Sequence, residues 1–181
     1  VALMALGTGA TSDITSQVEG IGSNLLTVQA GRLQFGPGNQ SRAQAFLYYS
    51  DFELLAANLE KVVSVVPVYQ SNLTVTYGKE TLSVSVSGAT PDFAQARAYT
   101  VADGRFITIT DNNHAARVVV LGSQTATDLF ASLNPIGRTI KIGNVNFEVV
   151  GVLESKGGSG FGSQDELVIV PIETGYQKLF G

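Results

Sequence analysis

Hydrophobic and polar residues alternate strictly along two neighbouring segments of the chain. In residues 73–77, Leu73, Val75 and Tyr77 alternate with threonines, and in residues 82–86 leucine and valines alternate with serines. Such alternation is typical of strands that bury one face and expose the other. The polar stretch between them contains Gly78, so the pattern predicts a β-hairpin.

Other segments predict further strands, some half-buried and some covered on both faces. The turn Gly143-Asn144 separates two apolar segments and predicts a second hairpin, while Asn134-Pro135-Ile136-Gly137 before it is a turn that stops a helix. Runs of consecutive apolar residues predict buried strands, the last of them stopped by Pro171. The further predicted strands are residues 25–29, 62–69, 117–121, 139–142, 146–153 and 167–170.

Apolar spacing of three and four residues predicts the helices. Residues 11–22 place Ile14, Val18 and Ile21 on one helical face. Ser50 and Glu53 form a capping box, and the helix after them should bury Phe52, Leu55, Ala56 and Leu59. We also expect a short helix within 91–97, a helix from a Ser123 cap through Phe130, and a helix that begins at Glu173. Residues 32–46 and 155–166 are rich in glycine and predict loops.

The alternating strands and short helices place the chain in the α+β class, with mixed β-sheets. Its 181 residues suit one large domain or two small lobes. Apolar residues make up 44% of the chain, enough for a core, and charged residues only 14%. The net charge of −4 gives no basic patch for nucleic acid. The absence of cysteine excludes disulfides, thiolate metal sites and a cysteine nucleophile.

Candidate catalytic and ligand-binding groups are few. His114 is the single histidine, and the sequence Asp111-Asn112-Asn113-His114 is more typical of a solvated turn than of a metal site, although Asp103 lies nearby in sequence. Asp165 and Glu166 are adjacent in a glycine-rich loop and should be solvated. The glycines of 157–160 precede no Gly-Lys-Ser/Thr, so a phosphate cradle is disfavoured. We therefore expect no enzyme activity, no cofactor and no metal.

Aromatic residues in or beside the loops are candidates for partner contact. Phe161 is the strongest because glycine flanks it on both sides; Phe35 and Tyr49 are further candidates. The alternative is that such rings fold back onto the core, with Tyr49 acting as a hydrophobic staple before the capping box.

A series of short motifs along nearly the whole chain resembles one protein family. They are residues 21–28 (IGSNLLTV) followed by Gly31, residues 65–67 (VVP), 86–93 (VSGATPDF), 104–106 (GRF) followed by Asp111, 117–122 (RVVVLG), 129–130 (LF), 134–137 (NPIG), 147–152 (FEVVGV) and 170–171 (VP). In this order and spacing they resemble the extracytoplasmic core domain of MacB-type ABC transporter permeases, and more distantly that of lipoprotein-releasing permeases.

This resemblance implies a domain without catalysis, placed between two membrane helices of a bacterial permease. It implies partners: an ABC ATPase subunit or domain on the cytosolic side, a membrane-fusion adaptor protein and a second permease copy. Cargo in such a family ranges over peptides, macrolides, toxins and lipoproteins. The helix at 11–22 would continue a membrane helix as a stalk, and two glycines inserted near Gln17 should uncouple ATP hydrolysis from export.

The resemblance also implies two lobes, named porter and sabre in the family. Residues 1–90 would form a porter-like lobe with the stalk helix, residues 91–165 a sabre-like lobe, and residues 166–181 would return into the porter-like lobe. Family members continue with another strand–helix–strand unit, so we expect an unpaired strand edge or an exposed apolar face here. The alternative function is a free exported module that binds a glycan or a peptide.

Overall fold

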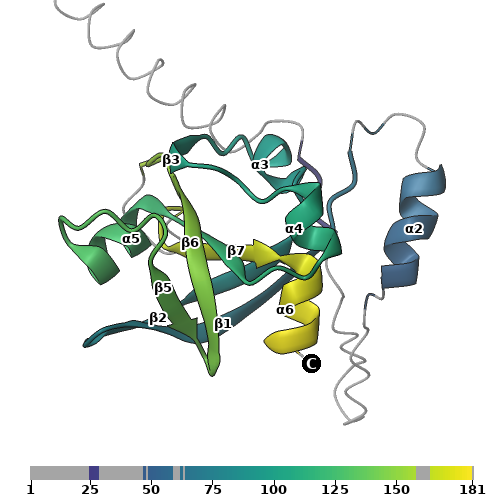
Figure 1. Ribbon diagram of the computed structural model, residues 1–181. Helices are drawn as coiled ribbons and strands as arrows, with labels where there is room; N and C mark the ends of the chain where they lie inside the picture. Colours follow the sequence, from purple (N-terminus) through teal and green to yellow (C-terminus); the bar gives the residue numbers. More distant parts are fainter. Residues whose placement is uncertain are drawn as a thin grey trace, which may run out of the picture.

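The computed structural model describes residues 25–28, 47, 49–58, 62, 64–157 and 164–180 of the chain. Seven strands form one sheet in the order β3-β6-β4-β7-β2-β1-β5 (Figure 1). The last strand, β5, also pairs with β6. That pairing closes β6, β4, β7, β2, β1 and β5 into a barrel, with β3 beside one end of β6.

The predicted hairpin at 73–86 is confirmed and is longer than expected. It comprises β1 (Val68–Tyr77) and β2 (Glu80–Ala89), which pair antiparallel along their full length from Val68↔Ala89 to Tyr77↔Glu80. Gly78 adopts φ +59° in the two-residue turn, a left-handed conformation that glycine tolerates without strain.

The predicted second hairpin and the two buried strands are confirmed. They are β5 (Thr139–Ile142) with β6 (Val145–Leu153), and β4 (Val118–Leu121) with β7 (Leu167–Pro171). Strand β3 (Val101–Gly104) pairs with the C-terminal part of β6. Because β6 is long, β5 and β3 share one of its edges in succession, while β4 occupies the other edge.

The central strands bury both faces, as their continuous apolar sequence predicts. Val119 and Leu121 of β4 face a core inside the barrel, and Val120 between them faces a second core outside it. Strand β7 alternates in the same way, with Val168 inward and Ile169 outward. This two-sided burial explains why these strands lack polar alternation.

Helix α5 (Ser123–Phe130) covers the barrel and contributes Ala126, Leu129 and Phe130 to the inner core. The Phe130 ring packs against Tyr77 with the ring centroids 4.1 Å apart. The expectation that Ser123 caps this helix is wrong, because Gly122 is the N-cap residue and Ser123 is the first helical residue.

The remaining helices are α2 (Tyr49–Asn58), α3 (Phe93–Ala96), α4 (Ile109–Asn113) and α6 (Ile172–Lys178). Their positions confirm the helices predicted within 91–97 and near Glu173. The helix expected after Ser50 is also present, but it begins at Tyr49, so Ser50 is a helical residue and not the predicted cap. Helix α6 lies against β1 and β2 (Figure 1), and the chain after it folds back so that Phe180 stacks on Tyr69 at 4.4 Å. None of the helices in the described part of the chain is long and apolar enough to span a membrane.

Three expectations about the N-terminal half are wrong. Residues 25–28 belong to no strand, and β1 begins at Val68 rather than at residue 62. The predicted apolar stripe of α2 is only partly buried, since Leu55 is 37% exposed and Ala56 is exposed, whereas Phe52 is half-buried. Propensity and capping specify a helix locally, but burial of its apolar face depends on a packing partner. The predicted helix at 11–22, the loop at 32–46 and Leu59 lie outside the described residues.

Strands from all three predicted segments share the single sheet. Strands β1 and β2 come from residues 1–90, β3 to β6 from 91–165 and β7 from 166–181. The α+β class with mixed parallel and antiparallel pairing is confirmed. The division into porter-like and sabre-like lobes at these boundaries stays a prediction.

Candidate functional site

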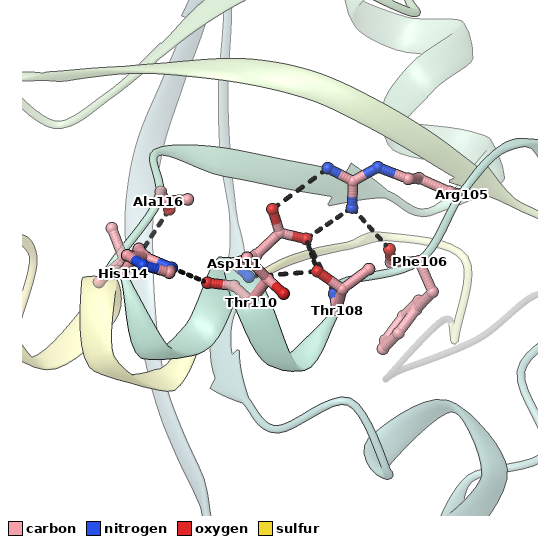
Figure 2. Close-up of polar contacts among 8 residues, drawn as sticks. Arg105, Phe106, Thr108, Thr110, Asp111, His114 and Ala116 are labelled. Atoms are coloured by element: carbon pink, nitrogen blue, oxygen red, sulfur yellow. Dashed lines mark hydrogen bonds and ion pairs between the residues drawn. The ribbon is translucent and has the colours of Figure 1, made fainter.

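The segment around the single histidine forms a helix with a buried carboxylate, so the predicted solvated turn is wrong. Thr108 caps α4: its hydroxyl accepts the Asp111 amide at 3.1 Å, and the Asp111 carboxylate accepts the Thr108 amide at 2.9 Å. Arg105 donates to both oxygens of the same carboxylate, at 2.6 and 3.2 Å (Figure 2). Asp111 is only 9% exposed.

The pKa of Asp111 reflects a balance between burial and these bonds. Burial raises the pKa, but the hydrogen bonds from Arg105 and Thr108 outweigh it and hold the pKa at about 2. Asp111 is therefore ionised at neutral pH, and its hydrogen-bond donors come from the fold itself. The Thr108-x-x-Asp111 spacing is a capping-box signature in the sequence that could have revealed this helix start.

His114 lies at the far end of α4 and has no metal-binding surroundings. Its Nδ1 lies 2.9 Å from the carbonyl oxygen of Thr110, which accepts the hydrogen bond (Figure 2). No group of three or more histidine, cysteine, aspartate or glutamate side chains with metal-binding geometry occurs among the described residues.

Asp165 is buried and connects residues 155–156 to α5, so the expectation that it is solvated is wrong. Its carboxylate accepts hydrogen bonds from the Ser155 hydroxyl at 2.6 Å and the Lys156 amide at 2.9 Å, and from the Ser123 hydroxyl. Burial raises its pKa, but these bonds outweigh burial and lower the pKa overall. Its backbone carbonyl accepts the Gln124 amide at 3.2 Å, which ties the segment to the first turn of α5. The neighbouring Glu166 is exposed, as expected.

An open hollow of about 420 Å³ lies between α5, β3 and the end of β6. The twelve lining residues include two exposed carboxylates, three hydroxyls and otherwise small or apolar side chains, and they include no lysine, arginine or histidine. They are Ala102, Asp103, Ser123, Ala126, Thr127, Ala131, Leu133, Pro135, Val152, Leu153, Glu154 and Ser155.

Several motif glycines stand where the backbone comes too close for any side chain. A Cβ added at Gly151 would overlap the carbonyl oxygen of Arg105, and one at Gly104 would overlap that of Val150. A Cβ at Gly122 would overlap the carbonyl oxygen of Asp165. A Cβ added at Gly88 would lie 3.2 Å from the nearest atom of the Phe180 ring. These motif positions therefore maintain close packing between strands and loops.

The three aromatic residues predicted for partner contact cannot be placed. Phe161 and Phe35 lie outside the described residues, as does the side chain of Tyr49, although Tyr49 begins α2. No sequence pattern predicts the hollow. Asp103 and Glu154 are far apart along the chain, and the antiparallel pairing of β3 with β6 brings them to one surface.

A model of the MacB-like periplasmic core domain family matches residues 1–180. The chain belongs to this family. Curated relatives of this MacB-like domain include the macrolide export ATP-binding/permease protein MacB of Bdellovibrio bacteriovorus, 36% identical over all of this chain and 28% of the relative. The pyoverdine export ATP-binding/permease protein PvdT of Pseudomonas aeruginosa is 34% identical over all of this chain and 26% of the relative.

Solved structures agree with this assignment. The periplasmic region of MacB from Actinobacillus actinomycetemcomitans superposes with a TM-score of 0.72 at 25% identity, over 91% of this chain and 72% of that one. The extracellular domain of the ABC-type transporter YknZ from Gram-positive bacteria shares the fold, with a TM-score of 0.65 over 75% of this chain and 67% of that one. This MacB-like domain spans only about a quarter of the length of its curated relatives.

Proposed function

We propose that this chain is the extracytoplasmic domain of an export transporter permease. It docks a membrane-fusion adaptor protein and transmits to it the movement that follows ATP hydrolysis by another domain or subunit. Membrane helices flanking the domain would anchor it, and two copies would work together in the transporter. The domain itself performs no catalysis and holds no cofactor.

The observation that carries this proposal is the family match over residues 1–180, together with the likeness to the periplasmic region of MacB. The curated relatives carry "export" in their names, for macrolides in one case and pyoverdine in another.

The side-chain chemistry supports a mechanical role. The most buried carboxylates, Asp111 and Asp165, are held by hydrogen bonds that cap helices and fasten loops. The motif glycines permit close backbone packing. These two buried carboxylates therefore have structural roles, which suits an element that transmits force.

The proposal is tested by capture of the adaptor encoded alongside the transporter, using the full-length transporter in detergent. We expect capture by the wild type. We propose Phe161, Phe35 and Tyr49 as contact residues, so Phe161→Ser should weaken capture while Tyr176→Ser, at a 69% exposed aromatic of α6, should not. A wild-type transporter that captures no adaptor would contradict the docking role.

A further inference from the structure

The polar side chains that line the hollow between α5, β3 and β6 can act only as hydrogen-bond acceptors toward an occupant. Asp103 and Glu154 are exposed carboxylates at its wall. Neither forms an ion pair within the described part of the chain. A carboxylate at neutral pH only accepts hydrogen bonds.

The three hydroxyls of the hollow can likewise only accept hydrogen bonds from an occupant, because each already donates its single proton to another group of the protein. Thr127 donates to the carbonyl oxygen of Ser123 at 2.9 Å. Ser155 donates to the Asp165 carboxylate at 2.6 Å, and Ser123 donates to the same carboxylate. A hydroxyl that has donated its proton can offer only oxygen lone pairs to a ligand. An occupant must therefore bring hydrogen-bond donors, and the nearby carboxylates favour a positive one.

The rest of the lining suits an aliphatic chain. Ala102, Ala126, Leu133 and Val152 form apolar walls between the acceptors. Leu133 is 52% exposed and extends the apolar surface to the rim. Lysine and arginine side chains have this composition: an aliphatic stem that packs on apolar surface and a charged donor head. The hollow is open to solvent, which suits a side chain presented by another protein more than an enclosed small molecule.

We infer that this hollow receives a lysine or arginine side chain of the adaptor protein, with Asp103 and Glu154 as its charge partners. The inference rests on the proposed docking function and adds to it a location and a chemistry for one contact. Charge complementarity at an open rim increases the association rate and makes binding sensitive to salt.

The test measures the affinity of the full-length transporter in nanodiscs for the adaptor encoded alongside it. The double variant Asp103→Asn with Glu154→Gln removes both charges without changing side-chain size. We expect affinity to fall about tenfold, the scale of one or two partly exposed charge pairs, and its salt dependence to flatten. The control, Glu80→Gln with Asp92→Asn, removes two exposed charges that do not line the hollow and should stay within about twofold of wild type.

The outcomes distinguish a failure of this inference from a failure of the proposed function. A wild-type transporter that does not bind the adaptor overturns both. If the wild type binds and the two double variants behave alike, docking stands and the assignment of this hollow is wrong. If the variant instead abolishes self-association of the transporter domain and leaves adaptor affinity unchanged, the occupant is a second copy of this chain and the adaptor assignment is likewise overturned.

Discussion

The guanidinium of Arg105 holds both carboxylate oxygens of Asp111, at 2.6 and 3.2 Å, while the same carboxylate caps the first turn of α4. Through this pair the chain that leaves β3 is fixed to the helix that follows it. Helix α4 in turn contacts α6. The Thr174 hydroxyl of α6 also donates to the carbonyl oxygen of Ala116, just after α4, at 2.8 Å. Both motif residues, Arg105 and Asp111, therefore have a structural role.

Removing the arginine should destabilise the domain. Arg105→Ala leaves a buried carboxylate without its charged donor, and because the Arg105 side chain is 47% exposed the cost should be moderate, about 1–2 kcal/mol. Urea unfolding of the 181-residue chain measures it. Arg117→Ala, at an exposed arginine, should stay within about 0.5 kcal/mol of wild type. Equal losses in the two variants would show that the Arg105–Asp111 pair contributes nothing specific.

Stability should fall in acid because Asp111 must be protonated. Its pKa is lowered from 3.8 to about 2 in the folded chain, so its contribution is complete above pH 3.8 and is lost as the pH falls from there to about 2. Thermal unfolding of wild type and Asp111→Asn across this range isolates the effect. The difference between them should shrink by about 2 kcal/mol toward low pH. A constant difference would mean that the carboxyl has an ordinary pKa.

Gly151 should tolerate no side chain. An added Cβ would overlap the Arg105 carbonyl, so Gly151→Ala must separate β6 from the segment after β3, at a cost of about 3 kcal/mol or more. Gly78 is a matched control because its added Cβ meets nothing within 4 Å. Only its φ of +59° opposes alanine, which costs about 1–2 kcal/mol. Chemical denaturation compares the two, and a larger loss at Gly78 would contradict the packing role of Gly151.

Two fully buried threonines should respond in opposite ways to loss of their hydroxyls. Among the described residues the Thr125 hydroxyl has no hydrogen-bond partner, whereas that of Thr174 donates to Ala116. Thr125→Val should leave stability unchanged or raise it by up to about 1 kcal/mol, because an unsatisfied polar group leaves the core. Thr174→Val should cost about 1–2 kcal/mol by leaving a buried carbonyl unpaired. Calorimetric melting of both variants decides, and a destabilised Thr125→Val would imply a partner for that hydroxyl.

Local sequence patterns were sufficient for the hairpins and the buried strands. The alternation at Leu73, Val75 and Tyr77 reflects burial of one face of a strand. The apolar run that ends at Leu121 reflects burial of both faces. The closure of the barrel depends on the pairing of β5 with β1, a long-range pairing with no local signal. For α2 the capping box predicted a helix, but no local pattern says whether Leu55 finds a packing partner.

The polar groups were harder to predict because their role depends on neighbours distant in sequence. Asp165 stands in a glycine-rich segment and would be solvated but for the hydroxyls of Ser123 and Ser155. The polar sequence around Asp111 favours a turn, although Thr108 three residues earlier marks a helix start. The hollow could not be predicted, since Asp103 and Glu154 meet only through the register of β3 on β6.

The central claim is that this domain transmits motion between an ATP-hydrolysing partner and an adaptor. ATP hydrolysis by the full-length transporter in nanodiscs, measured with and without the adaptor, tests it most directly when two glycines are inserted at Gln17 in the predicted stalk. We expect the adaptor to change the hydrolysis rate of the wild type, and the insertion to abolish that response while basal hydrolysis persists. An undiminished adaptor response in the inserted transporter would contradict the account.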